Sequence, residues 1–193
     1  MRANRCVRVC ARLILLVIVT ATALLAPPPP LFAAGAPLAD PGLPTTVPAI
    51  GRTWPVGLRP RVLRGWEPPA TVYGPGHRGV DLAAPAGTPV RAVAPGRVAF
   101  AGRVAGRGVI SVDLAGTGDP PLRTTYEPVT AAVEEGEEVE PGEVIGTVDA
   151  SGSHCTTTCV HWGLRRGEGY LDPLSLLPPW LLYMGPSRLL PLT

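Results

Sequence analysis

The chain contains three histidines, and the first of them, His77, lies in a setting that could bind a metal. Asp81 follows it by four residues, while Gly74, Gly76 and Gly79 argue against a helix in this stretch. We therefore expect a loop that leads into a strand and presents both side chains to one point. Imidazole nitrogen and carboxylate oxygen are both good zinc ligands. By spacing alone, however, a surface histidine near a solvated aspartate explains the pair better.

The second candidate ligand, His161, lies in a run that alternates like a strand, Cys159–Leu164. Successive side chains of a strand point to opposite faces. His161 shares its face with Cys159 and Gly163, so we expect it to face a cleft or the solvent. The small Gly163 would leave room there for a metal or a ligand, whereas the alternative is a half-buried structural histidine. The apolar side chains of the other face, expected in the core, are Val160, Trp162 and Leu164.

Two cysteines, Cys155 and Cys159, directly follow the remaining histidine, His154. An even pair of cysteines in an exported protein favours a small disulfide, which would shape the rim beside His161. The alternative is a Cys-x3-Cys-x-His zinc site in which both sulfurs are thiolates. His154 could turn into the same cleft as a proton carrier or as a residue around the metal, or it could be an exposed loop histidine.

Three segments, found in a fixed order along the chain, carry a family resemblance. They are Gly76–Val98 (G-H-R-G-V-D-L-A-A-P-A-G-T-P-V-R-A-V-A-P-G-R-V), Val133–Val148 (V-E-E-G-E-E-V-E-P-G-E-V-I-G-T-V) and Cys159–Arg166 (C-V-H-W-G-L-R-R). They resemble, in that order, the N-terminal signature, the strand–turn–strand and the closing His-x-His strand of lysostaphin-type (LytM-like) peptidoglycan endopeptidases. The resemblance covers about Gly76 to Asp172.

The resemblance implies a catalytic zinc site. The ligands would be His77, Asp81 and His161, with a water in the remaining position, which is the arrangement of catalytic rather than structural zinc. Zinc would lower the pKa of that water and polarise the scissile carbonyl. The implied activity is that of a zinc metalloendopeptidase, a hydrolase that cuts stem peptides or cross-links in bacterial cell-wall peptidoglycan.

Two histidines of the family pattern are missing from this chain. Cys159 stands at the first histidine of His-x-His, and Pro128 stands where the family has a histidine after a Thr-x-Tyr-x stretch. The resemblance implies that those histidines move protons and stabilise the oxyanion, and His154 is the candidate to replace them. Strand alternation predicts that Glu127 faces the opposite side. The alternative function is a catalytically degenerate domain that binds peptidoglycan or regulates another cell-wall hydrolase.

Short β-type runs separated by glycine and proline must position these residues. Many short strands with glycine-rich turns indicate an all-β, antiparallel sandwich or barrel-like domain. The resemblance implies the duplicated hybrid motif of the lysostaphin-type fold. The expected strands are Gly79–Ala84, Thr88–Val93, Arg97–Val104, Val109–Leu114, Leu122–Val129, Val144–Asp149 and Cys159–Arg166.

The chain divides into four expected parts. Residues 1–36 combine arginines, the apolar run Leu13–Ala26 and small residues, in the order typical of a secretory signal peptide. A proline-rich, extended segment (37–70), the peptidase-like domain (71–175) and a C-terminal tail (176–193), irregular or with one short helix, follow. The apolar run is short for a membrane span, which needs about 20 residues. We expect a secreted, extracytoplasmic protein at the cell wall without a stable membrane span; the alternative is an uncleaved anchor.

Charge and composition exclude two other classes of function. Without residues 1–36, the chain has 13 basic and 15 acidic residues, so nothing indicates a nucleic-acid-binding surface. Biotinyl and lipoyl carriers are β-barrels of similar shape, but they need a lysine for attachment. Every basic residue here is an arginine, which excludes that class.

Overall fold

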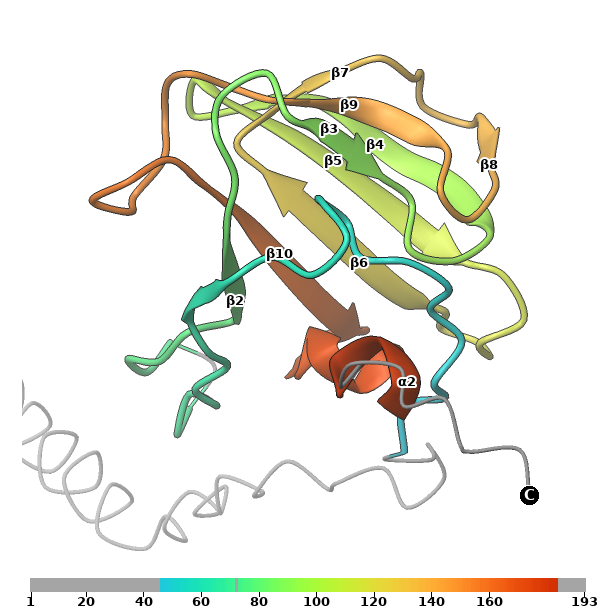
Figure 1. Ribbon diagram of the computed structural model, residues 1–193. Coiled ribbons are helices and arrows are strands. Elements are labelled where there is room, and N and C mark those ends of the chain that lie inside the picture. Colours follow the sequence, from blue (N-terminus) through green and yellow to red (C-terminus); the bar gives the residue numbers. More distant parts are fainter. Residues whose placement is uncertain (1–45, 72, 184–193) are drawn as a thin grey trace, which may run out of the picture. The chain divides into compact units, whose positions relative to one another are not determined.

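The computed structural model describes residues 46–71 and 73–183, and Figure 1 shows how their elements are arranged. The expected signal peptide, residues 37–45 of the proline-rich segment and residues 184–193 of the tail lie outside the described residues. Within the described part, the regular structure is almost entirely β. No helix there has the length and apolar character needed to cross a membrane.

Eight strands form the larger of two antiparallel sheets. They are β1 (Val62–Arg64), β2 (Gly79–Ala83), β4 (Gly96–Val104), β5 (Arg107–Leu114), β6 (Leu122–Glu127), β8 (Glu138–Val139), β10 (Cys159–Arg166) and β11 (Gly169–Leu171). Their order in the sheet is β1-β2-β10-β6-β5-β4-β8, with β11 paired to β10 at its far end. β10 therefore lies between β2 and β6, and it connects the two halves of the sheet.

The smaller sheet has the order β3 (Pro89–Arg91), β9 (Val144–Val148), β7 (Val129–Ala131). It packs on the β5 side of the larger sheet, as Figure 1 shows. The two layers approach closely: a Cβ added to Gly146 of β9 would lie 3.0 Å from Ile110 Cδ1 of β5. The predicted all-β architecture with antiparallel sheets is thus confirmed.

The hydrophobic core lies between these layers. Val160, Trp162 and Leu164 of β10 are fully buried in it, as strand alternation predicts. Trp162 also has its polar group satisfied, because Nε1 donates to Thr124 Oγ1 at 2.6 Å. The Thr124 hydroxyl in turn donates to the Gly163 carbonyl at 3.1 Å. These bonds fix β10 against β6, and so they fix the face of β10 that carries His161.

Residues 46–70 lie against the domain and contribute to its core. Trp54 and Val56 are 3% and 1% exposed, respectively, although both precede residue 71. Arg52 N donates to Val93 O, and Arg91 N donates to Pro55 O, each at 2.8 Å. Further along, β1 pairs with β2. The proline-rich segment therefore brings its residues to the strand on which Asp81 lies.

The described end of the chain packs under β2 and β10 through two short turns of helix. A 3-10 turn, η1 (Pro173–Leu176), begins after Asp172, whose Oδ1 accepts from Leu174 N at 2.9 Å. The four-residue helix α2 (Pro179–Leu182) follows, and the Leu181 carbonyl accepts from Trp54 Nε1 at 3.2 Å. This contact joins the two ends of the described chain.

All seven expected strands are present: Cys159–Arg166 has the same ends as β10, and the other six differ from the prediction at one or both ends. The expected strand Leu122–Val129 is divided, because β6 ends at Glu127 and β7 begins at Val129. Pro128 has no N–H to donate, so the ladder stops there. Three strands of only two or three residues were not predicted, β1, β8 and β11, and β7 was predicted only at its first residue, Val129.

Candidate metal centre

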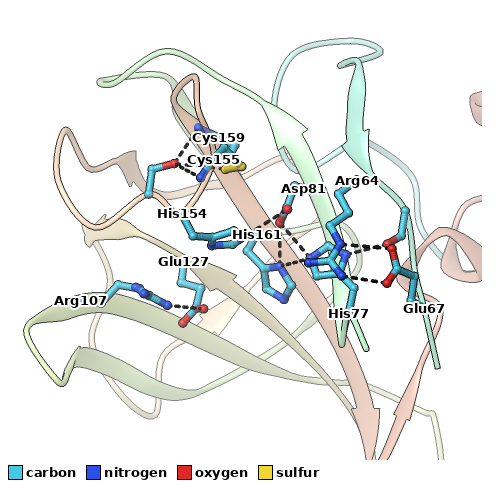
Figure 2. A network of polar contacts seen from close by, with 12 residues as sticks. Arg64, Glu67, His77, Asp81, Arg107, Glu127, His154, Cys155, Cys159 and His161 are labelled. Carbon is cyan, nitrogen blue, oxygen red and sulfur yellow. Dashed lines mark hydrogen bonds and ion pairs between the residues drawn. A yellow bond between two sulfur atoms is a disulfide. The ribbon is translucent and has the colours of Figure 1, made fainter. Parts of the chain in front are cut away.

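Three side chains that are far apart in the sequence meet on one face of the larger sheet. His77 Nε2 lies 3.1 Å from Asp81 Oδ1 and 3.1 Å from His161 Nδ1. His161 Nδ1 lies 2.9 Å from the same Asp81 oxygen. Figure 2 shows the three groups directed at one point. A cation bound at this point would have two imidazole nitrogens and a carboxylate oxygen around it.

The pairing of β2 and β10 explains why Asp81 and His161 meet. The two residues are direct partners in the antiparallel ladder. Side chains of directly opposed residues project from the same face, with their Cβ atoms about 5 Å apart. Gly79 contributes by having no side chain, since a Cβ at this position would lie 2.6 Å from His161 Nε2. The ring of His161 therefore occupies the space that any other residue at position 79 would fill.

Main-chain atoms of Gly65 and Glu67 fix the position of His77. Its backbone forms an isolated antiparallel β-bridge with Glu67, in which each N–H donates to the other residue's carbonyl, with N–O distances of 2.8 and 3.1 Å. Its Nδ1 lies 2.6 Å from the Gly65 carbonyl oxygen. Because a carbonyl can only accept, Nδ1 donates to it, and Nε2 is the ring atom that faces Asp81 and would be available to a metal. Metal-binding histidines are commonly oriented in this way by the partner of their other nitrogen.

Asp81 is buried, with 2% of its surface exposed, and both of its carboxylate oxygens have imidazole partners. Burial alone would raise the pKa of the carboxyl, but the hydrogen bonds from His161 and His154 and the nearby His77 lower this pKa to about 2. Asp81 is therefore ionised at neutral pH. A buried carboxylate with imidazole neighbours is well suited to bind a cation.

The third histidine contacts the other oxygen of the same carboxylate. His154 Nε2 lies 3.0 Å from Asp81 Oδ2, and the side chain is 38% exposed. The donor atoms of His77, Asp81, His154 and His161 all lie within 4.8 Å of one another. The structure thus brings together all four residues that the sequence singled out.

A disulfide anchors the loop that carries His154. Cys155, the next residue, is bonded to Cys159 at the start of β10. Ser153 Oγ accepts from the backbone N–H groups of Cys155 and Cys159 at 3.3 and 3.4 Å. The two sulfurs are bonded to each other, which agrees with the disulfide interpretation and not with thiolate ligation. The loop is therefore held on both sides of His154.

Residues 75–173, about half of the chain, match peptidase family M23. The chain belongs to this family. It is 43% identical over 145 residues to an uncharacterized protein of Mycobacterium tuberculosis, a match that covers 72% of this chain and 55% of that protein. It is 36% identical over 103 residues to the DD-carboxypeptidase/endopeptidase Mpg of Neisseria meningitidis, covering 53% of this chain and 23% of Mpg. The chain thus spans about half or less of these relatives.

Solved structures show the same fold. The catalytic domain of lysostaphin from Staphylococcus simulans superposes with a TM-score of 0.51 at 24% identity, over 64% of this chain and 93% of that domain. The lysostaphin-type, all-β fold of the M23 chain described above is therefore established. The M23 match begins at Pro75, two residues before His77, and it ends at Pro173, after β11.

A groove runs from the metal centre of this M23 domain along the exposed face of β10, β6 and β5. Its volume is about 500 Å³, and His161 and Gly163 line it, in agreement with the expected space beside Gly163. Arg78, Arg123 and Arg165 also line it. Asp113 pairs with Arg123 at 2.6 Å, and Arg78 lies 5.4 Å from the centre of the Tyr170 ring.

The sequence-based prediction for Glu127 was wrong. Glu127 is the direct ladder partner of His161, and it lines the same groove. The prediction assumed that the strand continues through Pro128, but β6 ends one residue earlier. Figure 2 shows Glu127 and its partner Arg107 on the His154 side of the centre. The signal that sequence reasoning lacked was the register between β6 and β10, which no local pattern reveals.

Proposed function

We propose that this protein is a secreted zinc metalloendopeptidase that cleaves peptide bonds in bacterial peptidoglycan. The observation that carries the proposal is the cluster of His77, Asp81 and His161 at one end of a groove. Membership of peptidase family M23 supports the reaction class. The DD-carboxypeptidase/endopeptidase activity in the name of the neisserial relative supports the choice of cell-wall peptides as substrate.

The donor set fits zinc in type and in spacing. Nitrogen and oxygen ligands about 2.0–2.1 Å from a tetrahedral zinc lie about 3.3 Å from one another. The donor atoms of His77, Asp81 and His161 are 2.9–3.1 Å apart, so they need to separate by only a few tenths of an ångström. Zinc at such a site supplies polarisation of a carbonyl and acidification of a water molecule.

We assign proton transfer to Glu127 in place of the two missing histidines. Its carboxylate shares the groove with His161 and is 25% exposed. Arg107 Nη1 lies 3.0 Å from Glu127 Oε1 and holds the carboxylate in position. A positioned carboxylate of this kind can accept a proton from a water molecule and return it to the leaving amine.

Two features support export. The arginines and the apolar run within residues 1–36 have the pattern of a secretory signal. The disulfide between Cys155 and Cys159 is of a kind that persists in oxidising compartments. We therefore place the working protein outside the cytoplasm, at the cell wall.

The test is digestion of purified peptidoglycan by the purified protein, with release of amino groups as the readout. We expect about one zinc per chain and hydrolysis that stops when a chelator removes the metal. His161→Ala should lose both zinc and hydrolysis. Glu127→Gln should keep the zinc and lose hydrolysis by a factor of about 10² to 10⁴, the usual contribution of general acid–base catalysis. A zinc-free wild-type protein would contradict the proposal.

The degenerate alternative is favoured by one observation, the presence of Cys159 and Pro128 at two family histidine positions. On this alternative, the protein binds peptidoglycan or regulates another cell-wall hydrolase. Zinc in the wild-type protein without any released amine, together with binding to intact cell-wall sacculi, would establish it in place of the peptidase.

A further inference from the structure

The metal centre contains one more donor than a hydrolytic zinc site uses. His154 Nε2 lies 3.0 Å from Asp81 Oδ2, whereas His77 and His161 face the other oxygen, Oδ1. We propose that His154 is a fourth protein ligand, so that the resting zinc site is closed by three histidines and one aspartate. This inference rests on the proposed function, because it concerns the same metal.

The distances allow one ion to be bound by all four residues. The four donor atoms lie within 4.8 Å of one another. Ligand atoms on a tetrahedral zinc are about 3.3 Å apart, so the longest separation has to shorten by about 1.5 Å at most. The imidazole of His154 is on a loop and is 38% exposed, so a small rotation of its side chain can achieve this. His77 and Asp81 are buried and set the position of the ion.

A disulfide and backbone hydrogen bonds restrain the loop that carries His154 on both sides of this residue. The disulfide begins at Cys155, directly after His154, and Ser153, directly before it, bonds to the backbone of both cysteines. The loop therefore keeps His154 beside Asp81, although the side chain is 38% exposed. A side chain held in this way loses little further entropy when it binds a metal.

A closed site has a functional consequence. Zinc with four protein ligands is of the structural kind, whereas catalytic zinc keeps one position for water or substrate. A substrate entering along the groove has to displace His154 before it can reach the metal. In this protein, His154 acts as a built-in cap, and the exchange of His154 for substrate regulates the site.

The test counts imidazole ligands in the zinc-loaded full chain by X-ray absorption spectroscopy. We expect three imidazoles in the wild type and two in His154→Ala. The zinc dissociation constant, measured by competition with a chelating dye, should rise at least tenfold in His154→Ala. The control is Thr157→Ala, an exposed residue of the same loop, which should leave both values unchanged. Circular dichroism of the metal-free proteins checks that each variant is folded.

Two results would overturn the proposal, and they are distinguishable. Two imidazoles and equal zinc affinity in the wild type and in His154→Ala would exclude His154 as a ligand but leave the three-residue zinc site intact. A wild-type protein without zinc would overturn the proposed function as well.

A second variant tests the role of the loop. Cys155→Ser combined with Cys159→Ser removes the disulfide but none of the four ligands. We expect its zinc affinity to fall toward that of His154→Ala, and not below it, because only the position of His154 is released. Unchanged affinity and three imidazoles in this double variant would contradict the anchoring role of the disulfide.

Discussion

At the scale of single residues, the metal centre is organised around one carboxylate. Asp81 Oδ1 faces His77 and His161, while Oδ2 faces His154. The ionised state of Asp81, with its pKa lowered to about 2, supplies the single negative charge of the cluster. A divalent ion bound there would keep a net charge of +1. The centre therefore attracts an electron-rich group, such as a peptide carbonyl, without strongly attracting a second cation.

The groove beside the centre has a free positive charge at its far end. Arg165 lies four residues beyond His161 on β10, about 13 Å away along the strand. Among the described residues, its guanidinium has no hydrogen-bond or ion-pair partner. Arg123, its ladder partner, is paired with Asp113. We therefore expect Arg165 to bind a carboxylate of a peptide substrate.

Arg165→Ala should raise KM for a peptide with a free carboxylate about three- to thirtyfold, the loss of one partly exposed charged contact, and leave kcat nearly unchanged. Steady-state hydrolysis of a peptidoglycan fragment and of its amidated form measures this. The matched control is Arg97→Ala, which removes an exposed arginine outside the groove. Equal KM values for both peptide forms in the wild type would contradict the role of Arg165.

At the scale of elements, the site depends on the close approach of β2 and β10. These strands place Asp81 opposite His161 and Gly79 opposite Gly163. A glycine is needed at position 79 because a Cβ there would lie 2.4 Å from the Trp162 carbonyl oxygen and 2.6 Å from His161 Nε2. Through this close approach, a residue without a side chain affects the position of His161, a proposed metal ligand.

Gly79→Ala should therefore displace His161 and weaken zinc binding by tenfold or more. It should also destabilise the fold by about 1–3 kcal/mol, the usual cost of overpacking. Dye competition gives the zinc affinity, and urea unfolding gives the stability. Gly169→Ala is the control, since a Cβ there would meet nothing closer than 3.5 Å. Similar zinc affinities for the two variants would show that the approach of the strands does not position His161.

The sequence predicts the elements better than it predicts the way they pair. Val160, Trp162 and Leu164 lie at alternate positions of an eight-residue strand, so the sequence alone predicts that they are buried. Glu127 could not be placed, because its face depends on where β6 ends and on its register with β10. The contact of His154 with Asp81 spans 73 residues and depends on a loop, which has no periodicity to read. Strands of two or three residues, such as β8, carry too few side chains to give a pattern.

At the scale of the whole molecule, we expect metal binding and folding to be coupled. The ligands come from the segment before β2, from β2 itself and from β10, which lies in the interior of the larger sheet. Residues 46–70 orient His77 through Gly65 and also contribute Trp54 to the core. We therefore expect the candidate metal centre to form only when the described domain is folded.

Zinc should raise the thermal stability of the protein. At a free zinc concentration 100 times the dissociation constant, an ion that binds only the native state adds about 2.7 kcal/mol. This corresponds to an increase in Tm of about 5–10 °C for a domain of this size. Calorimetry with and without a chelator measures the shift. His161→Ala should show no shift, and a wild-type Tm that is insensitive to zinc would contradict the coupling.

The hydrogen bond from His77 to the Gly65 carbonyl has a consequence for how this site tolerates change. The acceptor is a main-chain atom, which every amino acid provides, so a change of side chain at position 65 leaves the bond in place. A change in the length of the chain between Gly65 and His77 would move the acceptor away from the ring. The site should thus accept many substitutions in this stretch and few insertions or deletions, so spacing rather than sequence is the property it needs to keep.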